Sequence, residues 1–269
     1  MENGRLSKSF DIIGDIAIVK FEGKLTKKQK LELIKEVLEK NKNIKRVFEK
    51  TGIIEGNERI PKLKLLIGKG SLALYKENGF NFYVDVKKVF FSPRLGNERL
   101  RVIKLVKENE KVLDMFCGVG PFSIPIAKKC KNVVAIDINK KAIELLQKNI
   151  ELNKIKNIEF YCGDSKKVVK KLNTRFNRII MNFPLYAYKF LEAALQKADN
   201  KCTIHLYAFI KDGETKKFKK EIRDISEKYF RKVKIRENKV GEVAPFLERY
   251  CFDLELTNFI DEFKRYYQK

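Results

Sequence analysis

The chain has 269 residues, 44% of them hydrophobic and 35% charged, and its 59 basic and 35 acidic residues give a net charge of +24. This composition argues against general disorder. Because no run of about 18 apolar residues and no signal-peptide segment is present, we expect a cytoplasmic protein without a membrane span. The positive charge is typical of proteins that bind nucleic acid, although a lysine-rich composition of the kind found in thermophiles also produces it.

The N-terminal third of the chain has the pattern of a small α+β domain. The expected elements are strand material at 9–22, a helix at 25–42 and strands at 63–67, 72–76 and 81–86. Gly14-Asp15 separates two short apolar runs, and Asn78-Gly79 predicts a tight hairpin turn. We assign residues 1–92 to this domain.

From residue 93 onward, short apolar strands alternate with helices, a pattern that predicts a doubly wound, mainly parallel α/β sheet. The expected strands are 111–115, 132–136, 157–161, 177–181 and 202–209, and the expected helices are 121–130, 140–152, 164–172, 186–198 and 214–229. Two more strands, 232–238 and 249–257, suggest an antiparallel hairpin at the sheet edge. We assign residues 93–269 to this second domain.

The cysteine and histidine content indicates neither a disulfide framework nor a metal site. The five cysteines are widely spaced and include no C-x-x-C pair, so we expect buried free thiols. The single histidine, His205, has no cluster of metal-ligating residues around it in the sequence. We therefore expect His205 to be a core or edge residue, and we expect no metal.

The loop after the first strand of the second domain indicates a ligand-binding turn. Asp114 ends the strand, and Gly118 and Gly120 follow it, so the backbone can approach a ligand. A dinucleotide site favours a third glycine, and here that position is Ser123. The Asp114 carboxylate would repel a pyrophosphate, whereas a ligand with an ammonium and a sulfonium centre suits it.

Three more strands end in polar residues at the same predicted edge. Asp137, followed by Ile138, suits the two hydroxyls of a ribose, Asp164 suits an adenine amino group, and Asn182 presents an amide. Each residue alone is equally typical of a turn or a helix cap. In this order and spacing, together with Asp114, they resemble the S-adenosylmethionine-dependent methyltransferases of the Rossmann-like class.

The turn after the fourth strand narrows the type of target. It reads Asn182-Phe183-Pro184-Leu185, without the second proline and the aromatic residue found in enzymes that methylate exocyclic base amines. No cysteine stands beside this turn, as cytosine-C5 methylation would require. Methylation of a ring nitrogen is the remaining interpretation.

Several motifs together resemble the archaeal and eukaryal tRNA (guanine-37-N1)-methyltransferase family. They are the stretch 91–99 (FSPRLGNER), 114–122 (DMFCGVGPF), 149–154 (NIELNK) and Asn182-Phe183-Pro184. The resemblance covers residues 9 to about 257. It implies a small α+β domain that positions the anticodon loop, a Rossmann-like catalytic domain, S-adenosylmethionine as cofactor and a tRNA with guanosine at position 37. We expect a monomer.

The resemblance also implies roles for individual residues. Glu98, just before the first helix of the catalytic domain, is similar to the general base that removes the guanine N1 proton, although an acid there can also serve the helix dipole. Arg59 is similar to the arginine that stabilises negative charge on the guanine O6. The remaining roles go to Asn182 and Pro184, which would hold the base, and to Arg99, Phe116 and Asp137, which would position the cofactor.

Many family members carry a further N-terminal domain that grips the outer corner of the tRNA, and the resemblance here begins by residue 9. We therefore expect binding to rest on the remaining basic surface and to depend strongly on salt. Two alternatives stay open: transfer of the cofactor's aminocarboxypropyl group to a wyosine-pathway guanosine derivative, and a non-catalytic RNA-binding protein. A second activity, methylation of carbon 7 of that tricyclic base, is also compatible with the family.

Overall fold

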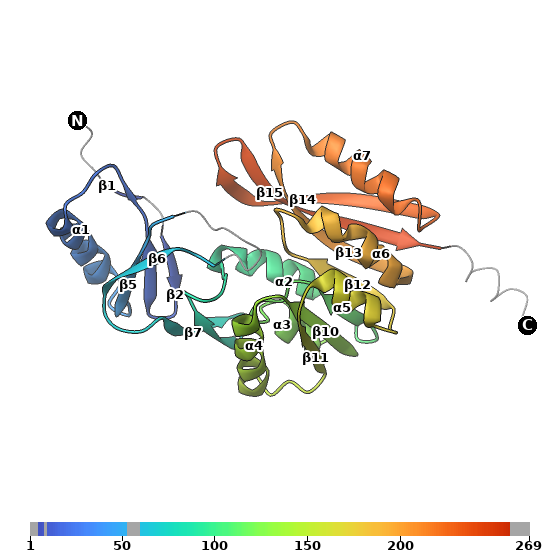
Figure 1. Ribbon diagram of the computed structural model, residues 1–269, viewed down its shortest axis with the longest axis horizontal. Helices are drawn as coiled ribbons and strands as arrows, with labels where there is room; N and C mark the ends of the chain where they lie inside the picture. Colours follow the sequence, from blue (N-terminus) through green and yellow to red (C-terminus); the bar gives the residue numbers. More distant parts are fainter. Residues whose placement is uncertain (1–4, 8–9, 53–59, 259–269) are drawn as a thin grey trace, which may run out of the picture.

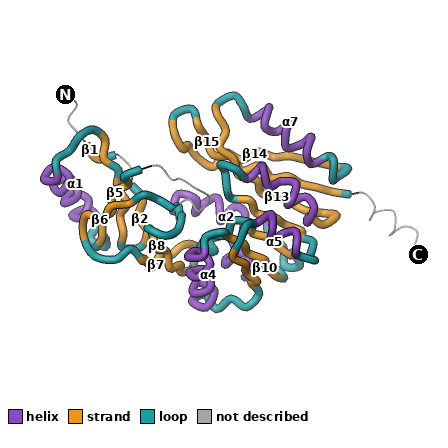
Figure 2. Tube along the Cα trace, in the orientation of Figure 1, coloured by secondary structure: helices purple, strands orange, loops and turns teal. Residues whose placement is uncertain are grey.

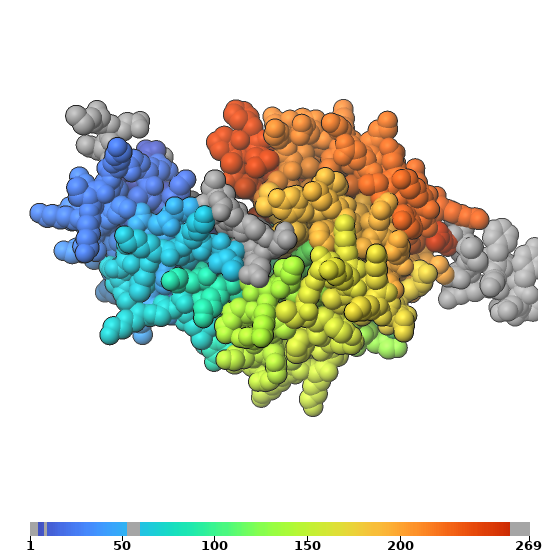
Figure 3. Space-filling view, viewed as in Figure 1, coloured from blue at the N-terminus to red at the C-terminus, as the bar shows by residue number. Residues whose placement is uncertain are grey.

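The computed structural model describes residues 5–7, 10–52 and 60–258, which form an N-terminal part and a larger α/β part that pack against each other (Figure 1). In the space-filling view, the blue to cyan surface of the N-terminal part meets the green surface of the α/β part (Figure 3). Within the described ranges, no helix combines the length and the apolar character needed to cross a membrane.

The N-terminal part is built on a four-stranded sheet with one helix. Its elements are β1 (Arg5–Leu6), β2 (Asp11–Ile13), β3 (Ile16–Val19), β4 (Phe21–Glu22), α1 (Lys27–Lys40), β5 (Arg46–Lys50) and β6 (Leu63–Ile67). The sheet order is β2-β3-β5-β6, and β3 and β5 are parallel because α1 connects them as a crossover. Thr26 and Gln29 form a capping box at the start of α1. Strand β5 is not among the expected strands, because its buried pair Val47-Phe48 is too short to show a pattern.

The expected hairpin consists of β7 (Leu72–Glu77) and β8 (Phe80–Asp85). Asn78 and Gly79 have φ values of 49° and 84°, as a two-residue type I′ turn requires. The hairpin packs against α4 (Lys140–Leu152), where the Asn149 side chain accepts a hydrogen bond from the Tyr83 N–H at 2.7 Å. The domain boundary at residue 92 stays a prediction.

The second sheet has seven strands. They are β9 (Lys111–Asp114), β10 (Asn132–Asp137), β11 (Ile158–Cys162), β12 (Phe176–Met181), β13 (Ala198–Lys211), β14 (Lys232–Ala244) and β15 (Leu247–Thr257). Their order is β11-β10-β9-β12-β13-β15-β14, with the first five parallel and β15 antiparallel to both of its neighbours. Figure 2 shows β13, β14 and β15 beside one another at one side of this sheet. This confirms the expected α/β fold with a hairpin at one edge.

Helices cover both faces of this sheet (Figure 1). Besides α4, they are η1 (Pro93–Leu95), α2 (Gly96–Leu105), α3 (Ser123–Ala127), α5 (Ser165–Lys171), η2 (Ala187–Phe190), α6 (Leu191–Lys197) and α7 (Thr215–Ser226). Neighbouring strand residues alternate between two cores, so that Val112 packs with α2, α3 and α4, and Leu113 packs with α5, α6 and α7. The expectation that Glu98 precedes the first helix is wrong. The turn η1 begins the helical path at Pro93, and Glu98 lies in the first turn of α2.

Candidate active site

A cavity of about 370 Å³ lies at the carboxyl ends of β9, β10, β11 and β12, the edge to which the sequence assigns its polar residues. The predicted site residues that line it are Arg99, Phe116, Gly118, Asp137, Ile138, Asp164 and Asn182. Others are not among the described lining residues, namely Glu98, Asp114, Gly120 and Pro184. Arg59 lies outside the described residues.

The two glycines of the loop after β9 differ in what they do. Gly118 has a φ of 54° and lines the cavity, and an added Cβ would meet nothing closer than the Phe90 carbonyl oxygen at 4.0 Å. Gly120 has a φ of 89°, and a Cβ there would lie 2.5 Å from Cδ1 of Leu146 on α4. Gly118 therefore leaves room for a ligand, whereas Gly120 lets the loop pack against α4.

Asp114 stabilises the loop after β9 through a buried hydrogen bond. Its side chain is 1% exposed, accepts a hydrogen bond from the Ser123 hydroxyl at 2.7 Å and faces the N–H of Phe116 at 3.4 Å. Burial raises the pKa of Asp114 to about 7. Asp114 therefore orders the turn, with Ser123 as its partner where dinucleotide sites carry a glycine, and its predicted contact with the cofactor stays a prediction.

Asp137 lies at the cavity wall at the end of β10. One carboxylate oxygen accepts a hydrogen bond from the Gly118 N–H at 2.7 Å, and the other accepts one from the Asn139 N–H at 2.9 Å. These two bonds fix the carboxylate at the cavity wall. The arrangement suits a ligand with two neighbouring hydroxyl groups, and Ile138 beside it is partly exposed at the wall.

Asp164 combines the two roles that its sequence position allows. Its side chain accepts a hydrogen bond from the Lys167 N–H at 3.1 Å and so caps α5, and the residue also lines the cavity. The neighbouring Ser165 is buried and donates a hydrogen bond to the Met115 carbonyl at 2.5 Å, which ties the start of α5 to the loop after β9.

Aromatic side chains form much of the remaining wall. The Phe116 ring lies 5.1 Å from the rings of both Phe183 and Phe190, and the Phe183 ring lies 5.5 Å from Tyr186. Tyr186 and Phe190 line the cavity but are not among the predicted site residues. The cluster of aromatic residues between 183 and 190, directly after a ligand-binding strand end, is the signal that identifies them.

Asn182 and Pro184 occupy different places in the turn after β12. Asn182 is half-buried and lines the cavity. Pro184 is buried, and its carbonyl accepts a hydrogen bond from the Phe209 N–H of β13 at 3.3 Å. Pro184 therefore fixes the turn that presents Asn182, and its predicted contact with a base stays a prediction.

Arg99 brings a positive charge to the cavity wall. Its side chain is 2% exposed, its guanidinium pairs with Glu77 at the end of β7, and it lies 5.1 Å from the centre of the Phe91 ring. It also donates a hydrogen bond to the Ser92 carbonyl at 3.1 Å. The cavity wall is thus anchored to the hairpin that precedes it in the chain.

The Glu98 side chain extends from α2 toward β13, where it contacts Tyr207. The residue is 8% exposed, and its carboxylate accepts hydrogen bonds from the Tyr207 hydroxyl at 2.7 Å and from Arg101 at 2.7 and 2.8 Å. Both oxygens therefore serve as acceptors, as in an ionised carboxylate.

The cysteines largely follow the sequence prediction. All five are free thiols, and Cys117, Cys130, Cys202 and Cys251 are buried. Cys162 is exposed, contrary to expectation, because it lies at the end of edge strand β11. His205 is fully buried within the sheet, as expected for a core histidine, but the fold brings Cys251 and Asp253 beside it, a grouping that the sequence does not show. The absence of a metal stays a prediction.

The sheet order and the cavity at its carboxyl edge define the class of protein, a Rossmann-like methyltransferase domain. Comparison with known families agrees: residues 73–236 match the TRM5/TYW2 methyltransferase domain, and residues 2–71 match the TYW2 N-terminal domain. The chain belongs to the TRM5/TYW2 methyltransferase family.

Named relatives and a solved structure are similar over most of the chain. The chain is 42% identical to the tRNA (guanine(37)-N(1))-methyltransferases Trm5b of Pyrococcus abyssi, over 86% of this chain and 69% of the relative, and of Methanocaldococcus jannaschii, over 79% and 62%. The structure of archaeal Trm5 in complex with tRNALeu matches with a TM-score of 0.82 and 37% identity, covering 94% of this chain and 73% of that one. The chain thus spans about two thirds of the length of these two relatives.

Proposed function

We propose that this protein transfers a methyl group from S-adenosylmethionine to N1 of guanosine 37 in the anticodon loop of tRNA. The observation that carries the proposal is the position of Glu98, an ionised carboxylate on α2 whose neighbour in the chain, Arg99, lines the cavity. The names of the Trm5b relatives support the choice of substrate and position.

The cavity fits the cofactor. The fixed carboxylate of Asp137 suits ribose hydroxyls, Gly118 leaves open space, and the rings of Phe116 and Phe190 offer apolar surface to an adenine. Asp164 would accept from the adenine amino group. When bound, S-adenosylmethionine supplies a methyl group activated by the sulfonium charge. Arg99 would bind its carboxylate end.

The protein's own residues then act on the guanine. Guanine N1 carries a proton at neutral pH, and its lone pair becomes available when Glu98 removes that proton. Asn182 would hold the base edge, and the rigid turn at Pro184 would fix its angle to the cofactor. Arg59 would stabilise the negative charge that develops on O6. In this step, the N1 proton would move to Glu98, the freed lone pair of N1 would form a bond to the methyl carbon, and the electron pair of the broken carbon–sulfur bond would stay on sulfur.

The tRNA would bind to the strongly basic surface, since the chain carries a net charge of +24. Binding that relies on lysine and arginine contacts with phosphates weakens steeply with salt. We place the protein in the cytoplasm, where tRNA is modified, as a monomer.

The aminocarboxypropyl transferase remains the alternative from the same family. That reaction does not require removal of the guanine N1 proton, so the held, ionised Glu98 favours methyl transfer. A purely RNA-binding protein would not need Asp137, Gly118 and Asp164 at one cavity.

Incubation with labelled S-adenosylmethionine and unmodified tRNA transcripts tests the proposal. We expect 1-methylguanosine with G37 and no transfer with A37. Aminocarboxypropyl transfer to wyosine-type tRNA without methylation would support the alternative. Binding of tRNA without either product would support the RNA-binding interpretation.

A further inference from the structure

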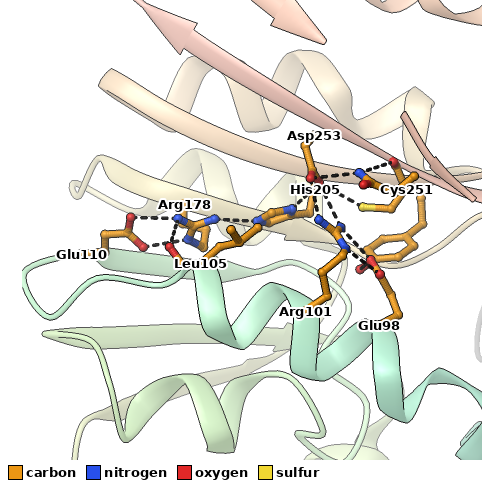
Figure 4. Close-up of polar contacts among 10 residues, drawn as sticks. Glu98, Arg101, Leu105, Glu110, Arg178, His205, Cys251 and Asp253 are labelled. Atoms are coloured by element: carbon orange, nitrogen blue, oxygen red, sulfur yellow. Dashed lines mark hydrogen bonds and ion pairs between the residues drawn. The ribbon is translucent and has the colours of Figure 1, made fainter. Parts of the chain in front are cut away.

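A continuous chain of polar contacts, buried at His205 and Arg178 and partly exposed at Arg101, runs along the sheet face beneath α2 (Figure 4). Its members, in order of contact, are Glu98, Arg101, Asp253, His205, Arg178 and Glu110. Glu98 and Arg101 come from α2, His205 and Asp253 are paired residues of β13 and β15, and Arg178 belongs to β12. The network ends at the proposed general base, so its hydrogen bonds bear on the reaction.

Arg178 fixes the charge state of His205, which lies in the middle of the network. Nη1 of Arg178 lies 2.7 Å from Nε2 of His205, and a guanidinium can only donate. Nε2 therefore accepts, the imidazole is neutral, and its proton is on Nδ1, which donates to Asp253 at 2.6 Å. Asn238 donates a further hydrogen bond to Asp253 at 3.0 Å. Asp253 is thus a fixed, ionised carboxylate.

Arg101 is shared between two carboxylates. It donates to both oxygens of Glu98 and, at 2.7 and 3.2 Å, to both oxygens of Asp253. When Glu98 takes up a proton and becomes neutral, Arg101 keeps Asp253 as its partner. The Arg101 side chain is 29% exposed, and the negative charge of Asp253, held close to Glu98 through Arg101, makes proton uptake by Glu98 easier.

Tyr207 acts on Glu98 in the opposite sense. It is fully buried, and its hydroxyl donates to Oε1 of Glu98 at 2.7 Å, which favours the ionised carboxylate. Oε1 thus accepts two hydrogen bonds, from Tyr207 and Arg101. Among the described residues, Oε2 accepts one, from Arg101. The open acceptor position is on Oε2.

We propose that Tyr207, Arg101 and Asp253 are positioning residues that leave Oε2 of Glu98 as the proton acceptor and set how tightly it holds a proton. This inference rests on the proposed function of Glu98 as the base. In the step, the guanine N1–H bond breaks, its electron pair stays on N1, and the proton forms a bond to Oε2. In the part of the chain that the structure describes, the titratable and charged groups near Glu98 are Arg101 on its own helix, Tyr207 on β13, Cys251 on β15, and Asp253 on β15, which acts through Arg101.

Two substitutions in the same network test the proposal because they should act in opposite directions. Tyr207→Phe removes a donor to ionised Glu98, so the acidic limb of the pH profile for single-turnover methyl transfer should move up by about one pH unit. Asp253→Asn leaves Arg101 with Glu98 as its one ionised partner, so the limb should move down. Tyr250→Phe is the matched control, because Tyr250 donates at 2.7 Å to Glu248, outside the network.

A titration that needs no activity separates this inference from the proposed function. The infrared carboxylate band of Glu98 is isolated in each protein by subtracting the spectrum of the same protein carrying Glu98→Gln. The pH midpoint of this band should move up in Tyr207→Phe and down in Asp253→Asn. Unmoved midpoints, or shifts in one direction, would overturn the inference whether or not methyl transfer occurs. Absence of transfer to G37 by wild type, with the infrared shifts present, would instead count against the proposed function alone. If Asp253→Asn does not fold, an unmoved band in Tyr207→Phe overturns the inference by itself.

Discussion

Arg99 and Glu77 form a two-point ion pair that joins the cavity wall to the end of β7. Nε of Arg99 donates to one oxygen of Glu77 at 2.6 Å and Nη2 donates to the other at 2.5 Å, with side chains only 2% and 9% exposed. Such a planar pair fixes both side chains. The hairpin and the proposed cofactor cavity are therefore coupled at one contact.

Breaking this pair should destabilise the fold. Glu77→Gln leaves the buried Arg99 charge without an ionised partner, and we expect a loss of about 3 kcal/mol in the free energy of unfolding, measured in urea, together with weaker cofactor binding. Glu22→Gln is the matched control, because the Arg5–Glu22 pair is exposed and should contribute at most about 1 kcal/mol. Similar losses in both variants would contradict the coupling.

The two loop glycines should respond differently to alanine. At Gly120, an added Cβ would meet Leu146 at 2.5 Å, so Gly120→Ala should lower the melting temperature markedly. At Gly118, the neighbouring space is open, so Gly118→Ala should cost only the strain of its φ, about 1 kcal/mol, while cofactor affinity falls. Thermal unfolding and calorimetric titration with S-adenosylmethionine distinguish the two. A large stability loss at Gly118 with intact affinity would be the contrary result.

Glu98 and Asp137 should separate rate from cofactor affinity. Glu98→Gln removes the base, so methyl transfer should fall by about 100-fold or more with little change in cofactor affinity. Asp137→Ala should weaken cofactor binding, since its carboxylate also holds the Gly118 N–H. Single-turnover rates and equilibrium dialysis measure the two quantities. Equal loss of both in Glu98→Gln would indicate a structural role for Glu98.

His205 should make stability fall in mild acid. Burial lowers the pKa of His205 in the folded state, so its contribution is complete above about pH 6.5 and is lost as the pH falls toward the folded-state pKa. Because His205 is the single histidine, His205→Gln should remove this loss between pH 7 and pH 5.5. Urea unfolding at several pH values measures the slope, which cannot exceed about 1.4 kcal/mol per pH unit for one group.

Asp114 provides a control for the pH dependence of stability, because its contribution falls as the pH rises, whereas that of His205 falls as the pH drops. Its folded-state pKa is raised to about 7, so the stability it contributes is complete below the unfolded-state pKa and is lost as the pH rises toward 7. Asp114→Asn should therefore steepen the rise of stability with pH that His205 produces. A flatter profile in Asp114→Asn would show that another group dominates this range.

The sheet could be predicted from the sequence because its strands are short, apolar and separated by helices. The position of the cavity could also be predicted, because parallel strands bring their carboxyl ends, and the polar residues there, to one edge of the sheet. Strand β5 was missed because local pattern is weak there and its pairing with β3 depends on the crossover through α1. Helix α2 lacks a side-chain N-cap, so its start gave no signal in the sequence.

The polar network beneath α2 could not be predicted from the sequence. Members in direct contact are as many as 152 positions apart, as are Arg101 and Asp253, and they meet only because β15 inserts between β13 and β14. Long-range strand pairing decides this network. Tyr186, by contrast, is a local feature: it immediately precedes the 3-10 turn after β12, one position beyond the residue that a base-stacking motif would use.

The side chain of Asn149 bonds two segments at once. Its amide oxygen accepts from the Tyr83 N–H, and its amide nitrogen donates to the Tyr83 carbonyl at 3.2 Å and to the Val119 carbonyl at 3.0 Å, between the two glycines. One small side chain therefore fixes the distance between β8 and the glycine loop. A nucleic acid bound to the N-terminal part would then lie at a fixed distance from a methyl donor bound at that loop.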